Sequence, residues 1–422
     1  LSTELKSYLK DRDVQYYEGR CVSIGQAISY WPFLDILRSY LNLSDSDTET
    51  DVARKLREAI TDLFPQRYED ILPFLGNLMS IKLGDDMDNK VKYYNPEQIR
   101  HQTLMALRNI FVAISSRKPL LMILEDLHWS DDLSLELISL LMDELSTNPI
   151  MLLCIYRPER EHKCWKIADT ATRKCIERYV EIILKQLSKI QSRQLVESLL
   201  EIDNLPETTK DMVLVKSEGN PFFIEEVIRF LIDSDVIYHE SERWKARKEI
   251  ADINVPDTIQ SVLLSRVDRL QSETKYVLQC ASVVGRLFRY RLLDHLLQHE
   301  KDLEGHLSQL EDRDLIYEER TIPEIEYTFK HALTQEATYQ GILERKRQDF
   351  HRQIADGIED LYRDRLDDFY EELSHHYKLG GNEEKAIDYL LKSGIKLANQ
   401  YANQSALDYF NEAESMINQS AL

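Results

Sequence analysis

The sequence predicts an α/β domain with a parallel β-sheet, followed by domains that are mostly helical. Short apolar segments alternate with helical patterns over residues 1–185, whereas helical patterns dominate after Leu187. Strands that alternate with helices are typical of a parallel sheet with helices packed on its faces. The predicted strands span residues 14–21, 120–124, 150–156 and 179–184, and helices are predicted between them, for example at 96–113 and 133–145.

Two further regions follow from changes of pattern around this core. Residues 36–95 are mostly helical with acidic loops, SDSDTETD and DDMDN, and we expect them to form an insertion on the α/β core. Residues 186–250 are predicted to be a helical lid. A polar stretch that ends near Pro256 marks the next domain boundary, because polar segments with proline commonly interrupt regular structure.

The remaining chain divides into two predicted domains. Residues 256–340 contain helices, a strand, a turn around Pro323 and a second strand, which is the pattern of a winged-helix domain. Residues 341–422 are helical throughout. There AIDYL at 386–390 is echoed by ALDYF at 406–410, which hints at helical repeats of the tetratricopeptide type, although the spacing is shorter than that repeat's period.

Composition narrows the function classes. The 422 residues are 43% hydrophobic and 30% charged, with a formal net charge of −21, which opposes broad binding to nucleic acid or to anionic membranes. No apolar stretch approaches the roughly 20 residues of a membrane span, and no signal segment opens the chain, so we expect a cytoplasmic protein. The cysteines are odd in number and form no CxxC, which favours reduced, buried thiols: Cys21, Cys154, Cys164, Cys175 and Cys280.

The stretch LEDLHWSDDLSLELI places two acids, Glu125 and Asp126, at the end of a predicted buried strand. In an open α/β sheet, ligands collect at the carboxyl ends of strands. One carboxylate there can hold the Mg²⁺ of a nucleotide, and a second can orient the attacking water. The alternative is a strand end that leads into a helix capped by Ser130, Asp131 or Asp132. The residue types alone leave both interpretations open.

Two other segments carry candidate site residues. In CIYRPE, Arg157 follows the next predicted strand, where an arginine can contact phosphate; a solvated strand-end charge is the alternative. In GNPFFIEEVIRFL, residues Gly219, Asn220 and Pro221 begin an amphipathic helix, and proline in the first turn of a helix is by itself ordinary.

Six segments in order along the chain resemble the AAA-type signalling ATPases of the STAND group, in particular the ATPase region that accompanies class III adenylate/guanylate cyclase domains. They are EGRCVSIGQAISYWPFLDILR, LMILEDLHWSDDLSLELI, LLCIYRPE, EGNPFFIEEVIRFL, VPDTIQSVLLSRVDRL and YTFKHALTQEATY. The resemblance covers nearly the whole chain. It implies an α/β P-loop NTPase core followed by all-α winged-helix and tetratricopeptide-like domains.

The resemblance also implies ATP and Mg²⁺ as cofactors, and a role for each matching residue. Glu125 and Asp126 would be the magnesium and water carboxylates, and Arg157 a sensor of the phosphates. Pro221, in the Gly219–Asn220–Pro221 turn, would lie against the adenine. His331 in FKHAL would report the state of the phosphates; as a residue alone it is an ordinary core histidine beside Phe329. Many relatives carry two aspartates where this chain has Glu125 and Asp126, so which carboxylate contacts Mg²⁺ stays open.

The phosphate-binding pattern GxxxxGK[ST] of such ATPases is absent. The chain has 12 glycines, and none of them is followed by lysine. Residues 1–12 match the helix that normally follows this loop. We therefore expect that the loop and the first strand of the sheet lie upstream of Leu1 in a longer polypeptide, that this chain binds ATP poorly, and that strands beside the missing one have open edges.

Three rival functions remain. A winged helix could bind DNA, but residues 301–320 carry three basic and seven acidic residues, a net charge of −4, so we expect no nucleic acid at this region.

The C-terminal helices could form an interaction scaffold for protein partners, with Ala386, Tyr389, Leu390, Ala406 and Phe410 at packing positions. His375 and His376 are adjacent on a helix and point about 100° apart, which opposes a shared metal.

A cyclase is the third rival. This chain carries none of a cyclase's own catalytic residues, so that activity would belong to an effector domain elsewhere on the same polypeptide. The sequence as a whole predicts a signalling ATPase module that switches such an effector, without contact to a membrane.

Overall fold

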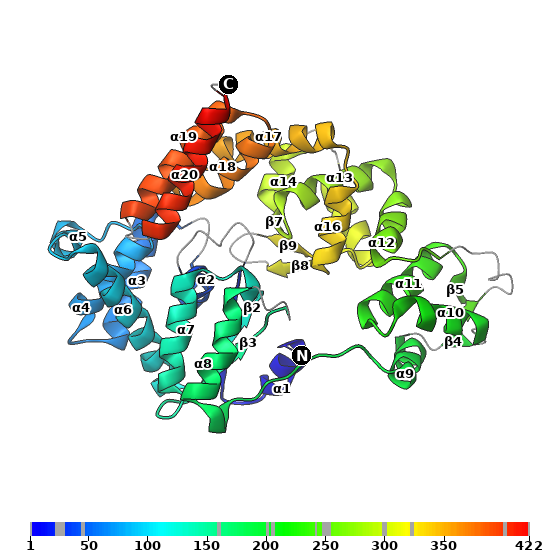
Figure 1. Cartoon of the computed structure of the whole chain (residues 1–422), viewed down its shortest axis with the longest axis horizontal. Helices are drawn as coiled ribbons and strands as arrows, with labels where there is room; N and C mark the ends of the chain where they lie inside the picture. Colours follow the sequence, from blue (N-terminus) through cyan, green and yellow to red (C-terminus); the bar gives the residue numbers. More distant parts are fainter. Residues whose placement is uncertain are drawn as a thin grey trace. The chain divides into compact units, whose positions relative to one another are not determined.

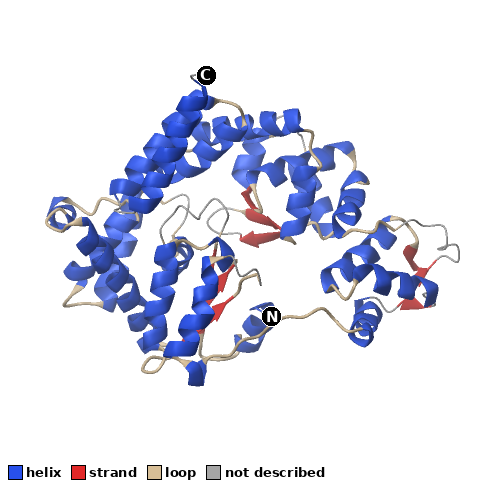
Figure 2. Ribbon diagram, viewed as in Figure 1, coloured by secondary structure: helices blue, strands red, loops and turns tan. Residues whose placement is uncertain are grey.

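The structure is a computed structural model of the 422-residue chain. It describes the chain except residues 1, 22–29, 44–46, 158–161, 200–201, 204–206, 241–242, 247–254, 298–301, 321–324, 400–402 and 421–422. The chain divides into two compact units, Leu1–Glu181 with Tyr362–Leu422, and Ile182–Leu361 (Figure 1). The described strands form three small sheets among many helices, which confirms the predicted class of a parallel sheet with a mostly helical remainder (Figure 2).

The sheet of the first unit is parallel and has three strands in the order β1-β2-β3. They are β1 (Gln15–Arg20), β2 (Leu120–Glu125) and β3 (Ile150–Cys154). β1 and β3 end one or two residues earlier than expected, and β2 ends one residue later. The residues of β2 from Leu120 to Leu124 are all at most 2% exposed. A central parallel strand is covered on both faces, which explains why this segment reads as a continuous apolar run.

Helices accompany this sheet, and all of them except the first, which has no buried residue, contribute to one hydrophobic core with it. They are α1 (Ser2–Leu9), α2 (Trp31–Tyr40), α3 (Glu49–Leu63), α4 (Tyr68–Leu78), α5 (Asp85–Val91), α6 (Pro96–Arg117), α7 (Asp132–Glu144) and α8 (Lys166–Lys174), with short 3-10 turns η2 (Leu127–Trp129), η3 (Lys163–Trp165) and η4 (Ile176–Arg178). Buried Leu56 of α3 and Leu72 of α4 belong to the same core as Met122 of β2. The segment DDMDN, expected as a loop, forms the start of α5 instead.

The predicted strand at Tyr179–Leu184 is wrong. These residues are in no helix or strand, and none of the described strands pairs with them. Their apolar side chains are exposed, with Val180 at 78% and Leu184 at 76%. An apolar run indicates burial, but a strand also requires a neighbour that takes its backbone hydrogen bonds.

The second unit begins with a helical part and a small sheet. The helices are α9 (Lys189–Leu199), α10 (Glu207–Ser217) and α11 (Pro221–Asp233), and the strands β4 (Ile202–Asp203), β5 (Ile237–Glu240) and β6 (Arg243–Ala246) pair in the order β4-β6-β5. The sequence pattern did not predict this sheet. Its strands are only two to four residues long, too short for a clear alternation of apolar and polar side chains.

The rest of the second unit contains the predicted hairpin, β8 (Ile316–Arg320) with β9 (Glu326–Phe329); the turn at Pro323 lies outside the described residues. A third strand, β7 (Leu287–Arg289), pairs with β9 and was not predicted. The accompanying helices are α12 (Ile259–Asp268), α13 (Ser272–Val284), α14 (Tyr290–Leu296), α15 (Leu303–Asp312), α16 (Ala332–Gln340) and α17 (Glu344–Leu361).

The C-terminal part consists of a 3-10 segment, η6 (Arg363–Phe369), and the helices α18 (Tyr370–Leu379), α19 (Glu383–Asn399) and α20 (Asn403–Ser420). The echoed sequences lie on consecutive packed helices, with Ala386 of α19 and Ala406 of α20 both buried. Gly394 of α19 faces Phe410, and a Cβ at Gly394 would lie 2.4 Å from that ring. Close helix packing at these positions accounts for the small residues. No helix in the described part of the chain is long and apolar enough to cross a bilayer.

Candidate functional site

Glu125 lies at the carboxyl end of the central strand β2, where it forms an ion pair with Arg20. The parallel register places Arg20, the last residue of β1, directly beside Glu125. The Arg20 guanidinium donates to Glu125 Oε2 from Nη2 at 3.3 Å and from Nε at 3.4 Å, and the Ser2 hydroxyl donates to Oε1 at 3.2 Å. The two charged side chains are 20% and 21% exposed. Because two neighbours bind its two oxygens, Glu125 is held in one orientation.

Asp126 ends the strand with a sharp change of direction. Its φ of 56° and ψ of 34° are left-handed, a conformation that aspartate tolerates better than most residues, and the 3-10 turn η2 follows at once. The backbone on either side is tied to the flanking strands: Cys21 N–H donates to the Glu125 carbonyl at 3.0 Å, and Leu127 N–H donates to the Ile155 carbonyl at 3.1 Å. The sheet therefore fixes the backbone that carries both carboxylates.

Arg157 follows β3 and is exposed. Its guanidinium lies 5.9 Å from the centre of the Trp129 ring, in η2. Trp129 in turn contacts the ring of buried His128, with the ring centres 4.5 Å apart. The structure thus brings Arg157 to the aromatic turn that follows Asp126.

Asp131 is the residue that caps α7. Its Oδ1 accepts a hydrogen bond from Ser134 N–H at 2.9 Å and another from Tyr30 N–H at 3.2 Å. Burial raises the pKa of Asp131. Burial, together with the negative charges of Asp131 and Asp126, also raises the pKa of the Cys21 thiol to about 12, so this thiol stays protonated at neutral pH. Asp131 therefore has a structural role, and capping does not occupy Glu125 or Asp126.

The donor set at the end of β2 fits a magnesium ion that is shared with phosphate. Mg²⁺ is usually held by one or two carboxylates, while waters and phosphate oxygens complete its shell. Glu125 and Asp126 supply oxygen donors of this kind, although Glu125 can bind a metal only if Arg20 yields part of its contact. In the described residues, no group of three or more His, Cys, Asp or Glu side chains is arranged to hold a metal ion.

In the second unit, Gly219, Asn220 and Pro221 form the start of α11. Gly219 has a φ of +80°, and a Cβ there would lie 2.3 Å from the carbonyl oxygen of Leu187. The Leu187 N–H donates to the Gly219 carbonyl at 2.8 Å. The Asn220 side chain accepts from Phe222 N–H at 3.0 Å and caps the helix, and Pro221 occupies its first turn. Backbone geometry explains all three residue types at this turn.

His331 lies beside this turn. It precedes α16, and its ring centre is 3.9 Å from that of Phe222, the residue after Pro221. Burial, together with the positive charges of Lys330, Arg286 and Arg229, lowers the pKa of His331 to about 4. The imidazole is therefore neutral at pH 7.

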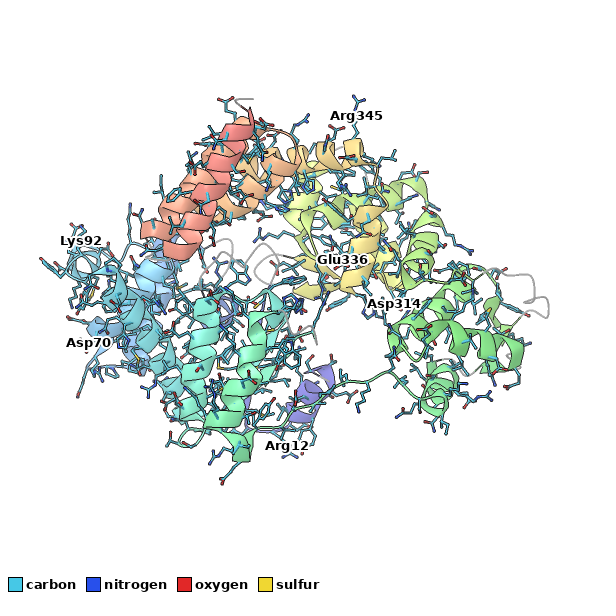
Figure 3. All side chains as sticks on the ribbon, in the orientation of Figure 1. Arg12, Asp70, Lys92, Asp314, Glu336 and Arg345 are labelled. Carbon is cyan, nitrogen blue, oxygen red and sulfur yellow. The ribbon has the colours of Figure 1, made fainter. Side chains whose placement is uncertain are left out.

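A buried charge network next to these residues was not predicted from the sequence. Arg266 of α12 pairs with Glu226 and Asp233 of α11. Nearby, Asp314 (labelled in Figure 3) pairs with Arg229 and with Lys330, the latter at 2.7 Å. The sequence feature that could have indicated this network is the presence of charged residues within two apolar helical patterns, FFIEEVIRFL and VLLSRVDRL.

The seven predicted site residues fall into two groups, one in each unit. Glu125, Asp126 and Arg157 belong to the first unit, at the ends of adjacent strands. The turn Gly219–Pro221 and His331 belong to the second unit, where Phe222 connects them.

Comparisons with known proteins agree with the AAA-type resemblance. Residues 1–153 match the AAA ATPase domain family, which confirms the resemblance for the α/β part, and residues 188–245 match a domain of unknown function. The chain is similar to an uncharacterized protein of Rhizobium meliloti, at 23% identity over 355 residues, which are 82% of this chain and 33% of that protein.

The chain is also similar to the peroxide stress-activated histidine kinase mak3 of Schizosaccharomyces pombe, at 23% identity over 334 residues, which are 74% of this chain and 14% of the kinase. It spans a third or less of the length of either relative. Among solved structures, it is similar to a signal transduction ATPase with numerous domains (STAND) from Pyrococcus horikoshii that has a tetratricopeptide repeat sensor. That likeness has a TM-score of 0.43 and 11% identity, and it covers 100% of this chain and 65% of the other.

Proposed function

We propose that this chain is the regulatory ATPase part of a signalling protein, and that the carboxyl end of β2 binds nucleotide and Mg²⁺. The observation that carries the proposal is the position of Glu125 and Asp126 at the end of the central strand, within the residues that match the AAA ATPase domain family. Ligands of open α/β sheets bind at this edge.

The proposed roles follow from how each residue is held. Bound Mg²⁺ would neutralise charge on the nucleotide phosphates. Of Glu125 and Asp126, one carboxylate would bind this ion and the other would accept a hydrogen bond from the attacking water and orient it. Arg20 and Ser2 orient Glu125, whereas the backbone turn orients Asp126, so substitution can separate the two roles. Arg157, exposed after the adjacent strand, would contact the phosphates.

We expect this chain to bind ATP weakly. The 422 residues contain no GxxxxGK[ST] pattern. In P-loop ATPases that loop supplies backbone N–H groups and a lysine to the phosphates. Two carboxylates and an arginine can support Mg²⁺-dependent binding. Without the loop, however, most of the contacts to the phosphates are missing.

We further propose that the second unit responds to the nucleotide through Gly219, Asn220, Pro221 and His331. The contact of Phe222 with His331 supports this, because the turn and the histidine belong to one packed cluster. With a pKa of about 4, the imidazole would take part as a neutral hydrogen-bonding group.

The output of the switch is proposed to be an effector on the same polypeptide, in the cytoplasm. A nucleotide cyclase is the first candidate. A histidine kinase is the second, because one relative is named as such. The C-terminal helices α18 to α20 would bind protein partners, since stacked helices of this kind offer an extended surface.

An inert interaction scaffold is the alternative function. It is favoured by the same stack, in which Gly394 allows close approach of α19 and α20, together with the absence of the phosphate loop from these 422 residues. In this case Glu125 and Asp126 would have no ligand.

Calorimetric titration of the chain with ATP, with and without Mg²⁺, distinguishes the two functions. We expect Mg²⁺-dependent binding in the range of roughly 10 µM to 1 mM. Either Asp126→Asn or Glu125→Gln, whichever removes the carboxylate that binds the ion, should weaken it about tenfold. Asp132→Asn is the matched control, because Asp132 is an exposed carboxylate nearby in the chain, at the start of α7, and is paired with Lys163. Submicromolar affinity would contradict the weak-binding proposal. No binding, or equal binding by all variants, would favour the scaffold.

A further inference from the structure

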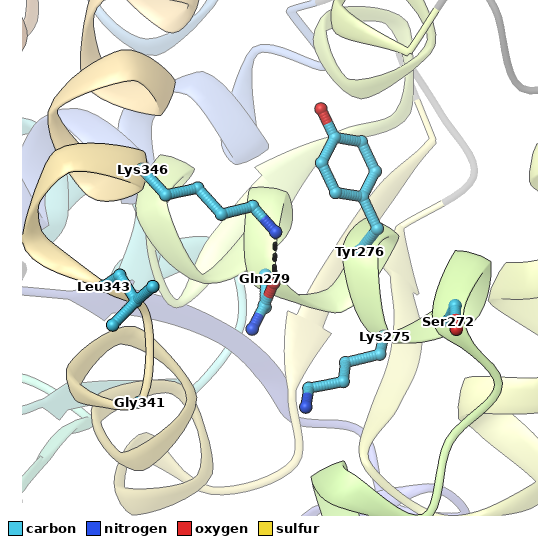
Figure 4. A pocket seen from close by; sticks show the side chains of 7 residues that line it. All are labelled: Ser272, Lys275, Tyr276, Gln279, Gly341, Leu343 and Lys346. Carbon is cyan, nitrogen blue, oxygen red and sulfur yellow. Dashed lines mark hydrogen bonds between the residues drawn. The ribbon is translucent and has the colours of Figure 1, made fainter.

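A recess in the second unit contains a lysine that no described carboxylate neutralises. It lies between α13 and the start of α17 and has a volume of about 320 Å³ (Figure 4). Its lining residues are Ser272, Lys275, Tyr276, Gln279, Gly341, Leu343 and Lys346. None of them belongs to the proposed nucleotide site.

Lys346 is held in this recess by groups that carry no negative charge. Its Nζ donates to Gln279 Oε1 at 2.8 Å, the contact drawn in Figure 4. The same Nζ lies 4.8 Å from the centre of the Tyr276 ring and 5.3 Å from that of Phe350. Burial and the charge of Lys275 lower the pKa of Lys346. The ammonium is thus partly desolvated and has room for an anionic partner.

Lys392 of α19 provides the contrast. Its Nζ also lies over aromatic rings, 4.6 Å from the centre of Tyr389 and 5.8 Å from that of Tyr370. Lys392, however, pairs with Asp388 at 2.7 Å. A lysine packed on aromatic rings in this chain can therefore have its own carboxylate, and Lys346 lacks one among the described residues.

The other lining residues suit an anion that has an apolar body. Lys275 brings a second ammonium to the recess, and its partner Asp268 is 66% exposed. Tyr276 provides an aromatic wall, and Leu343 is 79% exposed at the rim. An apolar side chain this exposed, beside an aromatic wall and two cations, offers apolar contact together with charge.

We propose that this recess binds a small organic anion, with its phosphate or carboxylate group at Lys346 and Lys275 and a planar or apolar body against Tyr276 and Leu343. The volume is at the lower end for ligand pockets, which limits the ligand to the size of about one or two rings. The anion would supply the counter-charge that Lys346 lacks, and a charge-assisted hydrogen bond to a partly buried ammonium is stronger than one in water.

The test is calorimetric titration of the full chain with 1-naphthyl phosphate. Two further compounds are titrated for comparison: 2-naphthol, which has only the aromatic body, and inorganic phosphate, which has only the anionic group. We expect submillimolar binding of 1-naphthyl phosphate and binding at least about tenfold weaker for the other two. Lys346→Gln should weaken binding about tenfold, whereas Lys346→Arg keeps the charge and should retain most of it. Lys392→Gln is the matched control and should have no effect.

Three results would overturn the proposal. They are no binding of 1-naphthyl phosphate at millimolar concentration, equal binding by the wild type and Lys346→Gln, and binding of 2-naphthol as tight as that of the phosphate. A thermal unfolding curve of each variant shows whether it is folded. If Lys346→Gln does not fold, then Lys275→Gln, with its exposed partner, replaces it and should weaken binding several-fold.

Discussion

Arg266 and Glu226 form an ion pair that is almost excluded from water. Nη1 of Arg266 donates to Oε2 of Glu226 at 2.5 Å, and the two side chains are 2% and 1% exposed. The same guanidinium donates from Nε to Asp233 at 2.9 Å and from Nη2 to the Arg313 carbonyl at 2.6 Å. One side chain of α12 therefore connects α11 with the end of α15, next to the cluster that holds His331.

Removal of Arg266 should be strongly destabilising. Arg266→Met leaves Glu226 buried without its cation, and breaking a buried pair in this way costs about 3–5 kcal/mol. Urea unfolding measures the loss. Arg54→Met is the control, because Arg54 pairs with Glu58 at an exposed position of α3 and should change the free energy of unfolding by less than about 0.5 kcal/mol. Similar losses in the two variants would contradict the importance of the buried network.

Gly219→Ala should disrupt the start of α11. The alanine Cβ would lie 2.3 Å from the Leu187 carbonyl oxygen, at a φ of +80°. Gly381→Ala is a close control, because its φ is +73° and nothing lies within 4 Å of the added Cβ. The control should lose about 1 kcal/mol from backbone strain alone. We expect a clearly larger loss for Gly219→Ala, measured by urea unfolding, and equal losses would show that the turn can move away.

His331 should make stability depend on pH below neutrality. Its pKa of about 4 in the folded chain lies below the ordinary 6.5, so protonation favours the unfolded chain. The contribution of neutral His331 is complete above about pH 6.5 and falls as the pH drops from 6.5 to 4. His331→Phe should therefore lose less stability than the wild type over this interval, as followed by the melting temperature. His101→Phe, at an exposed position of α6, should behave like the wild type.

The edge of β3 should promote association. Among the described strands β3 pairs only with β2, and Met151 on it is 54% exposed. Unpaired edges accept strands of other molecules, and a lysine on the edge opposes this. Met151→Lys should shift the sedimentation profile towards monomer. Leu333→Lys, which replaces an exposed leucine of α16, should leave the profile unchanged. A wild-type chain that is monomeric at all concentrations would refute this prediction.

The sequence was most informative where the pattern was local and long. The apolar run of β2 and the length of α6, which has a capping box from Asn95 and Gln98, identify these elements directly. Tyr179–Leu184 has the same apolar character as β2, yet it lacks a paired neighbour among the described strands. Pairing depends on distant parts of the chain, so composition cannot reveal it.

The site was predictable as residue types but not as contacts. Glu125 and Asp126 stand out because acids end an apolar run. The ion pair of Glu125 with Arg20 depends on the register between two strands separated by about 100 residues, which no local pattern specifies. The pairing of Arg266 with Glu226 likewise requires two helices to be packed before either charge has a partner.

The register of β1 against β2 therefore determines which charge lies beside Glu125, as well as which backbone groups pair. The residue beside Glu125 is Arg20 only in the observed alignment of β1 with β2. A slip of one residue would place Gly19 or Cys21 there, and every β1 side chain would change face. The carboxylate would then lose its cation without any change in the amino-acid sequence. The charge balance at the end of β2 thus depends on the hydrogen bonds of a neighbouring strand, and errors in folding could alter it as effectively as substitution.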